Sequence, residues 1–217
     1  MNDGEDPGAA PQPNQNIGYD DLFQHRYWHY IDLPFSRDGT PLIQPAKPNA
    51  LTQIEKFRDA LASEADDDVK SYDMVWLLHV VGDVHQPLHA TSRFSAASPQ
   101  GDRGGNDVTL CEPPCRNKLH SFWDGAAGSS SSPTAAIRAA GELDEAPSAA
   151  AAITNVSTWI EESFALAKRS VYRSPIGAGN GPFEITGPYR AKSRTIAEEQ
   201  IALAGARLGK LLNDFLR

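Results

Sequence analysis

The spacing of apolar residues predicts helices along most of the chain. Residues 48–64 place apolar side chains on one helical face, namely Leu51, Ile54, Phe57, Ala60 and Leu61. Residues 66–68 are three aspartates, which suit the first turn of a second helix. That helix continues through VKSYDMVWLLHVVGDVH and should end or kink near Pro87, which lacks a backbone donor. Residues 91–117, rich in Ser, Gly and Pro, predict a loop.

The second half of the chain has the same helical character. The segment NKLHSFWD at 117–124 predicts a short helix, and TAAIRAAGELDEA at 134–146 predicts a weaker one. Residues 148–172 and 193–217 predict two long amphipathic helices, separated by a loop at 174–189. The sequence shows neither a convincing strand ladder nor an internal repeat. The predicted fold class is therefore all-α.

The chain divides into a short tail and one helical domain. Residues 1–18 are of low complexity and predict a disordered tail, and residues 19–217 predict a single domain. The tail has neither a positive start nor an apolar run, so it does not read as a secretory signal. No stretch of the sequence resembles a membrane span. These features leave two alternatives, a cytoplasmic protein or a natural start upstream of Met1.

Charge and cysteine content narrow the classes of protein. The formal net charge is -8 and the pI is about 5.2, which argues against a broad basic face for nucleic acid. A polyanionic substrate would need another source of positive charge, such as bound metal. Cys111 and Cys115 are too few for a disulfide framework and cannot build a thiolate zinc site alone. A local disulfide and two free thiols both remain open.

Histidine is scarce, yet three of the six histidines lie in HVVGDVHQPLH at residues 79–89. His79 and Asp83 are four residues apart, so they share one helical face. His120 and Asp124 repeat that spacing. Burying two carboxylates beside neutral imidazoles without a cation would be costly, and this ligand set suits zinc. The sequence therefore predicts metal binding at both pairs.

The remaining histidines have different expected roles. His89 follows Pro87 and is free to join a second cluster, while His29 in WHYID offers a nitrogen from outside the long helix. His85 faces away from the His79 and Asp83 pair, so we expect a hydrogen-bonded core residue. His25 lies in a charged stretch, and we expect it at the surface.

Five segments together resemble a known family. They are WHYIDLPF at 28–35, LLHVVGDVHQPLH at 77–89, GDRGGND at 101–107, LHSFWD at 119–124 and AGARLGKLLN at 204–213. In this combination the chain resembles the single-strand-specific zinc nucleases of fungi and plants (the S-one/P-one type), which are related to bacterial zinc-dependent phospholipase C. The resemblance extends from about residue 19 to the end, and it implies an all-helical fold with three zinc ions in a cleft.

The resemblance also assigns roles to residues of this sequence. Six residues match the family's zinc ligands: His29, His79 and Asp83 for one zinc, and His89, His120 and Asp124 for a more separate one. Asp83 matches the carboxylate that bridges to a neighbouring zinc, and Asp32 matches the acidic residue near the attacking water. Asp32 and Asp83 are therefore the catalytic candidates. The loop GDRGGND matches the segment that shapes the cleft, with Asn106 and Asp107 in structural roles.

The implied reaction is hydrolysis of phosphodiester bonds in single-stranded DNA and RNA to 5′-phosphorylated products, with 3′-nucleotidase activity also typical. The implied partner is a single-stranded nucleic acid or a nucleotide. The implied enzyme is a monomer, secreted or periplasmic. A phospholipase C-like hydrolase is an alternative, but there H-x-x-x-E is usual at the separate zinc. Asp124 at that position favours the nuclease.

One part of the family pattern is missing. Family members bind zinc through an N-terminal tryptophan with a nearby histidine, and through an aspartate upstream of the WHYID motif. Here Trp28 is the first tryptophan. We therefore expect that the natural start lies upstream and completes the three-zinc site. The competing hypothesis is a zinc-stabilised helical domain that binds one or two zinc ions and is weakly active or inactive.

Overall fold

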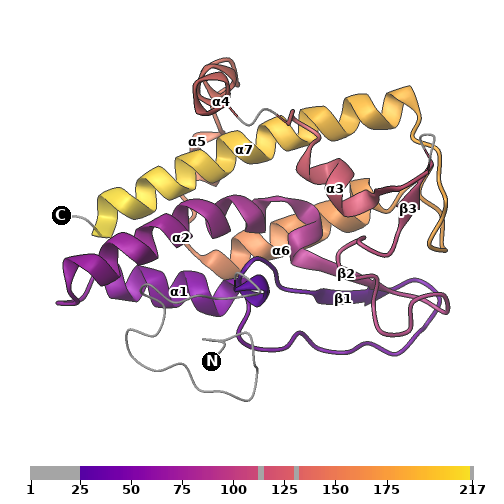
Figure 1. Ribbon diagram of the computed structural model, residues 1–217, viewed down its shortest axis with the longest axis horizontal. Helices are drawn as coiled ribbons and strands as arrows, with labels where there is room; N and C mark the ends of the chain where they lie inside the picture. Colours follow the sequence, from indigo (N-terminus) through magenta and orange to yellow (C-terminus); the bar gives the residue numbers. More distant parts are fainter. Residues whose placement is uncertain (1–24, 112–114, 130–131, 216–217) are drawn as a thin grey trace.

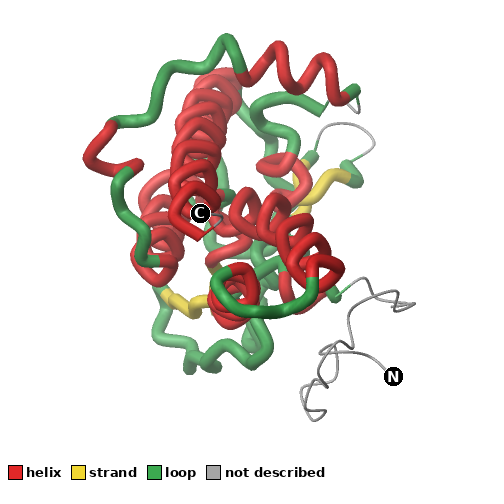
Figure 2. The backbone as a smooth tube through the Cα atoms, turned by 90° about the vertical axis from the view of Figure 1, so that its left-hand side faces the viewer, coloured by secondary structure: helices red, strands yellow, loops and turns green. Residues whose placement is uncertain are grey.

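The computed structural model describes residues 25–111, 115–129 and 132–215. Helices make up most of this part of the chain, as the sequence predicts, and the longest of them run lengthwise beside one another (Figure 1). The second helix is central, because it contacts the first, sixth and seventh helices. Figure 2 shows the same arrangement turned by 90°, with loops covering the helices on several sides. The tail predicted at residues 1–18 lies outside the described residues.

Local signals set the first two helices. Helix α1 (Ala50–Leu61) begins after Asn49, whose side chain accepts a hydrogen bond from the Thr52 amide while the Thr52 hydroxyl caps the Asn49 amide. Helix α2 (Asp67–His85) begins with acidic residues and ends two residues before Pro87. Apolar residues of both helices form one buried cluster with α6, including Ile54, Phe57, Leu77, Val80, Val84 and Trp159.

The region predicted as one helix at residues 148–172 is broken. It forms α5 (Ser148–Ala151), α6 (Val156–Leu166) and a π-helical turn, η3 (Ala167–Val171). The physical reason is Asn155, whose side-chain oxygen accepts from the Thr158 amide at 2.9 Å and starts a new helix. The single-helix prediction was therefore wrong at this point.

The other helices follow the predicted order. Helix α3 (Leu119–Asp124) is short, and α4 (Pro133–Ala140) starts with Ser132 as its N-cap and Pro133 in its first turn. Helix α7 (Gly187–Phe215) begins six residues earlier than expected, so it includes the end of the predicted loop. It spans the length of the molecule above α2 in Figure 1.

Two small sheets were not predicted. Strand β1 (Leu33–Ser36) pairs in parallel with β2 (Thr91–Phe94), and β3 (Thr109–Leu110) pairs antiparallel with β4 (Asn117–Lys118). The strands are too short to give an alternating pattern in the sequence. Two 3-10 turns, η1 (Arg26–Trp28) and η2 (Pro87–Ala90), precede β1 and β2.

The β1–β2 pairing brings two distant segments together. The residues just before β1 include His29, and those just before β2 include His89. The amide of Ile31 donates to the His89 carbonyl at 2.8 Å, and the His89 ring Nδ1 lies 2.7 Å from the His29 carbonyl. A short sheet therefore fixes the distance between two histidines that lie far apart in the sequence.

The structure also bears on the state of the two cysteines and on possible membrane spans. Cys111 and Cys115 form a disulfide, so the alternative of free thiols is excluded. Among the helices of the described residues, none combines the length and the apolar character that crossing a membrane requires.

Candidate metal centre

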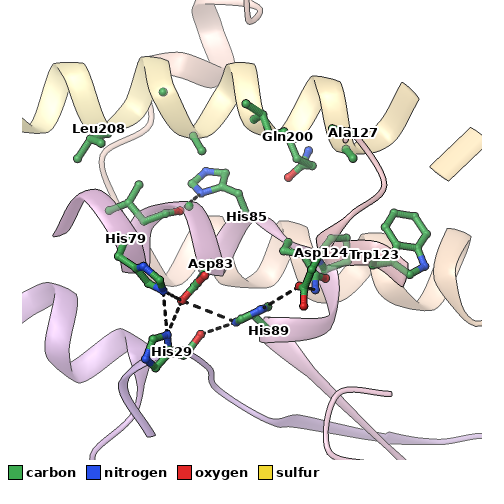
Figure 3. A pocket seen from close by; sticks show the side chains of 18 of the residues that line it. His29, His79, Asp83, His85, His89, Trp123, Asp124, Ala127, Gln200 and Leu208 are labelled. Atoms are coloured by element: carbon green, nitrogen blue, oxygen red, sulfur yellow. Dashed lines mark hydrogen bonds and ion pairs between the residues drawn. The ribbon is translucent and has the colours of Figure 1, made fainter. Parts of the chain in front are cut away.

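Helix α2 places the first pair of candidate ligands. His79 and Asp83 lie one turn apart on it, and His79 Nε2 lies 3.1 Å from Asp83 Oδ2. His29 approaches from the turn after η1, with Nδ1 at 3.0 Å from the same Asp83 oxygen and at 3.0 Å from His79 Nε2. The three atoms form a nearly equilateral triangle. Figure 3 shows these side chains pointing toward one another.

A second group combines residues of two other elements. His89 comes from η2, and His120 and Asp124 come from successive turns of α3. His89 Nε2 lies 3.4 Å from Asp124 Oδ1, and His120 Nε2 lies 3.7 Å from Asp124 Oδ2. In each group the ligand atoms lie within 4.8 Å of one another, and these are the two such groups that the described residues form. The structure thus brings together the six side chains that the sequence selected.

The ring orientations in the second group suit a metal ion. His89 Nδ1 faces the His29 carbonyl at 2.7 Å, and His120 Nδ1 faces the Gly104 carbonyl at 2.8 Å. A carbonyl only accepts, so both Nδ1 atoms carry the proton when the rings are neutral. Both Nε2 atoms are then left as lone-pair donors directed at Asp124. Backbone carbonyls that orient imidazoles in this way are typical of metal ligands.

The first group supports the same interpretation by a different argument. Two imidazole nitrogens and one carboxylate oxygen converge within hydrogen-bond distance of one another. If all three offer lone pairs, their repulsion must be offset by a cation. Both groups therefore could bind a metal ion, although binding itself stays a prediction.

Gln86 is a residue that the sequence analysis did not single out. Its side-chain amide donates to Asp124 Oδ1 at 2.8 Å, while its oxygen accepts from the Leu88 amide at 2.5 Å. Gln86 therefore orients the exposed carboxylate of the second group. Its position three residues before the candidate ligand His89, in the H-Q-P-L-H segment, is the signal that could have identified it.

Five of the six candidate ligands line one cavity of about 640 Å³, and the sixth, His120, lines a smaller pocket beside it. Residues of α2 and α7 line the large cavity, and Figure 3 shows Leu208 and Gln200 on the α7 side, with His29, His79, Asp83 and His89 on the opposite side of α2. His79 is 54% exposed and Asp124 is 48% exposed, so a molecule in the cavity can reach one ligand of each group. The arrangement suits a substrate that spans the two groups.

Electrostatics around Asp83 favour its charged form. Burial opposes ionisation, but hydrogen bonds with His29 and His79 outweigh it and hold the pKa of the Asp83 carboxyl well below its usual range. The hydrogen bond with Asp83 in turn raises the pKa of His79. Asp83 is therefore a carboxylate at neutral pH, which is the form that binds metal.

Asp32 lies outside both groups. It lines a small separate pocket with His120, and burial, together with the charge of Asp102, raises its pKa to about 7. A carboxyl group with that pKa can accept or release a proton near neutral pH. The catalytic role expected for Asp32 stays a prediction.

The segment GDRGGND forms a tight loop around one buried carboxylate. Asp102 is fully buried and accepts hydrogen bonds from the amides of Arg93 and Gly105 and from the Tyr172 hydroxyl. The Arg93 guanidinium Nε lies 3.4 Å from Asp102. Asp102 was not predicted from the sequence, in which Asn106 and Asp107 were the residues of this segment with expected structural roles. A buried Asp in a glycine-rich loop gives no periodic signal.

For the two histidines that are not candidate ligands, one prediction is confirmed and the other is wrong. His85 is buried as predicted, with Nδ1 at 2.7 Å from the Val81 carbonyl and Nε2 at 3.1 Å from Arg207 Nη1. The surface position predicted for His25 was wrong, because its ring stacks on Trp28 at 3.9 Å between centroids and is 4% exposed. Its Nε2 is bonded to the Tyr72 hydroxyl at 2.9 Å.

Gly104 makes the loop compatible with the second group. Its φ is +59°, and a Cβ there would collide with the Leu88 carbonyl oxygen and would lie 3.3 Å from His120 Nδ1. We expect Gly104→Ala to lower the free energy of unfolding by about 2 kcal/mol, from backbone strain and displacement of Leu88. Chemical denaturation measures this change.

The matched control for that substitution is Gly209→Ala in α7. A Cβ at Gly209 meets nothing within 4 Å, and alanine favours the helix, so stability should stay equal or rise by up to about 1 kcal/mol. If both variants unfold at the wild-type denaturant concentration, the close packing of Gly104 against Leu88 does not hold the loop in place.

Comparison with known proteins adds an independent observation. The family profile described as S1/P1 Nuclease matches residues 16–217, which is nearly the whole chain. The chain belongs to the S1/P1 nuclease family. Both candidate ligand groups and the loop GDRGGND lie within the part that this family profile covers.

Two plant proteins are similar to this chain over shorter segments. Endonuclease 4 of Arabidopsis thaliana is 27% identical over 124 residues, which is 48% of this chain and 39% of that protein. Endonuclease 2 of the same plant is 27% identical over 109 residues, which is 44% of this chain and 35% of that protein. The matched segment thus spans less than half the length of each relative. Family membership of the chain rests on the S1/P1 profile.

Proposed function

We propose that this S1/P1 family protein is a zinc-dependent endonuclease that hydrolyses phosphodiester bonds of single-stranded DNA and RNA to 5′-phosphorylated products. A 3′-nucleotidase activity belongs to the same proposal. The observation that carries it is the pair of His, His, Asp groups that open on one cavity, in a chain of a nuclease family. The names of the two plant relatives agree with endonuclease activity.

Zinc fits the donor sets of both groups. Tetrahedral zinc with ligands at about 2.0–2.2 Å separates neighbouring ligand atoms by roughly 3.3 Å. The corresponding distances are 3.0 and 3.1 Å in the first group and 3.4 and 3.7 Å between nitrogen and carboxylate in the second. When bound, zinc supplies Lewis acidity that polarises a phosphoryl oxygen and makes water nucleophilic near neutral pH. The chain offers ligand groups for two zinc ions among its described residues.

The residues of the chain have separate tasks in this proposal. His29, His79 and Asp83 hold one metal ion, and the second group holds another beside it. Asp32 exchanges a proton with the attacking water, which its raised pKa allows at neutral pH. Gln86 keeps the Asp124 carboxylate in one orientation through its amide. The metal ions provide local positive charge that a chain with net charge -8 otherwise lacks.

A phospholipase C-like activity is the second candidate function. The same cavity is lined by apolar side chains, among them Leu78, Ile201 and Leu208. An apolar wall beside two metal groups suits a phosphodiester that carries acyl chains. Asp124, in place of the glutamate usual for phospholipases, favours the nuclease.

The disulfide supports a proposal on cellular location. Cys111 and Cys115 are bonded, and disulfides persist in oxidising compartments. We propose that the enzyme acts as a monomer outside the cytoplasm, in the periplasm or after secretion.

Metal removal is the direct test of the proposed function. We expect the zinc-loaded chain to cleave single-stranded DNA, and chelation to abolish cleavage and to lower the melting temperature, because two carboxylates lose their cations. Elemental analysis gives the number of zinc ions, and gel assays compare single-stranded DNA, duplex DNA and phosphatidylcholine vesicles.

Each alternative gives a different result in these assays. Zinc bound at about two ions per chain with no hydrolysis of any phosphodiester would identify an inactive zinc-stabilised domain. Cleavage of phosphatidylcholine but not DNA would favour the phospholipase. A chain that binds no zinc would refute both hydrolase proposals.

A further inference from the structure

A second, smaller pocket of about 150 Å³ lies beside the second ligand group. Its lining includes Tyr30 and Asp32 from the segment after His29, and Arg103 and Asn106 from the loop GDRGGND. His120 forms part of its wall. This volume corresponds to about five water molecules, which is enough for one phosphate group with some hydration but too little for a nucleobase with its sugar. By size the pocket therefore suits one small group, and among its lining residues Arg103 supplies the positive charge that a phosphate requires, beside the Asp32 carboxyl group.

The loop holds Arg103 in a fixed place at the mouth of this pocket. Asp102 anchors the loop from inside, because it is fully buried and bonded to the amides of Arg93 and Gly105. The Arg103 backbone has a φ of +51°, a left-handed conformation that is uncommon for a residue other than glycine. Its carbonyl accepts from both the amide and the side chain of Asn106, at 3.1 and 2.8 Å. A residue with such a backbone conformation, fixed by hydrogen bonds to its carbonyl, is a frequent mark of function.

The guanidinium of Arg103 is both oriented and accessible. Its Nε lies 3.2 and 3.1 Å from the two carboxylate oxygens of Asp107, four residues on, and its Nη2 is also bonded to that carboxylate. Within the described residues, Nη1 has no hydrogen-bond partner, so three of the five N–H donors are available. The side chain is 71% exposed, so an anion can approach it from solvent.

The position of Arg103 relative to the two candidate ligand groups determines which phosphate of a substrate it can bind. Gly104, the next residue, accepts a hydrogen bond from His120 of the second group. The other five candidate ligands line the large cavity between α2 and α7, whereas His120 lines the small pocket. A phosphate at Arg103 is therefore adjacent to the one between the metal groups and is a different one. Only a substrate with several phosphates can occupy both places.

We propose that Arg103 binds a non-scissile phosphate of the nucleic-acid strand, next to the phosphodiester that is hydrolysed. This inference rests on the proposed nuclease function and adds to it a preference for polynucleotides over substrates with one phosphate. Arginine suits this role because its planar fork donates two parallel hydrogen bonds to phosphate. Asp107 is a positioning residue that keeps the fork directed at the pocket.

The test compares Arg103→Ala with the wild type for a polyanionic and a small substrate. Binding of a fluorescent phosphorothioate 12-mer of thymidine to the zinc-loaded chain is followed by anisotropy between low and moderate NaCl. We expect the Kd to rise about tenfold at low salt, and the slope of log Kd against log salt to fall by about 0.7, the value for one phosphate contact on a single strand. The ratio of kcat/KM for DNA to that for bis(p-nitrophenyl) phosphate should fall about tenfold.

Two further variants separate the role of Arg103 from general effects of charge. Arg194 in α7 is a matched control, because it is 66% exposed and is also paired with a carboxylate four residues on, Glu198. We expect Arg194→Ala to leave the Kd and the salt slope at wild-type values. Arg103→Lys should keep the salt slope and recover only part of the affinity, because lysine retains the charge but not the fork.

The outcomes distinguish failure of this inference from failure of the proposed function. If Arg103→Ala and Arg194→Ala change binding equally, or neither changes it, Arg103 does not contact the strand. A wild-type chain that hydrolyses neither substrate would refute the nuclease proposal, while the anisotropy measurement would still decide whether Arg103 binds phosphate. Circular dichroism confirms that each variant is folded.

Discussion

Replacing Asp83 with asparagine should lower the rate of single-stranded DNA hydrolysis by at least about a thousandfold, which corresponds to roughly 4 kcal/mol of lost transition-state stabilisation. Asp83 is the one carboxylate of the first group, and its Oδ2 lies 3.0 Å from His29 and 3.1 Å from His79. An amide has the same shape but carries no charge, so the cation loses its main electrostatic partner. Kinetic assays and elemental analysis of the purified variant measure the two losses.

A control on the same helix separates this effect from loss of net charge. Asp68 is exposed in the first turn of α2, so Asp68→Asn removes one charge far from the metal groups. We expect full activity and full zinc content, with a loss of stability below about 1 kcal/mol from the helix dipole. Wild-type hydrolysis by Asp83→Asn would refute the assignment of the first group as a metal site.

Arg207→Ala should lower the free energy of unfolding by about 2–3 kcal/mol, less than for a fully buried ion pair, because Glu162 is 40% exposed and can be hydrated. The Arg207 side chain is buried within α7, and its Nη2 lies 2.7 Å from Glu162 of α6. It also donates to the Ala150 carbonyl at 3.1 Å and lies 3.1 Å from His85 Nε2. Removing it leaves polar groups of three helices without their partner. Urea denaturation of the zinc-free and zinc-loaded chain measures the change.

The identity of the lost interaction can be checked with a second substitution. Arg207→Met keeps most of the side-chain volume but removes the charge and the donors. If Arg207→Met is as stable as the wild type while Arg207→Ala is not, packing rather than the polar network explains the effect. A loss below about 1 kcal/mol for both variants would show that this arginine does not tie the helices together.

Helices that depend on local signals were predictable from the sequence. The apolar spacing of residues 48–64 predicted α1 (Ala50–Leu61). The aspartates at the start of α2 and Pro87 after its end predicted the bounds of the second helix. In residues 148–172, apolar spacing alone was misleading, because the side chain of Asn155 caps a new helix inside the pattern. Periodicity detects a helical face, but a single capping side chain decides where a helix starts.

Contacts between distant segments were not predictable in the same way. The parallel pairing of β1 with β2 involves four residues on each side and gives no alternating pattern. His25 was expected at the surface because its neighbours are charged, yet it packs between Trp28 and Trp76. Its burial depends on tertiary packing of aromatic rings that the local sequence does not describe.

The candidate site falls between these two cases. The four-residue spacing selected His79 with Asp83 and His120 with Asp124, because that spacing is a property of a helix. The addition of His29 to the first pair and of His89 to the second came from the family resemblance. Gln86 and Asp102 were missed, since hydrogen bonds that orient other side chains leave no signature of spacing.

The hydrogen bond between the His89 ring and the His29 carbonyl couples the geometry of the first ligand group to that of the second. His29 supplies its ring to the first group and its backbone to the orientation of a ligand in the second. A displacement of the peptide segment around His29 therefore changes the geometry on both sides at once. A substitution near His29 that adapts one ligand group to a new substrate should therefore also disturb the other group.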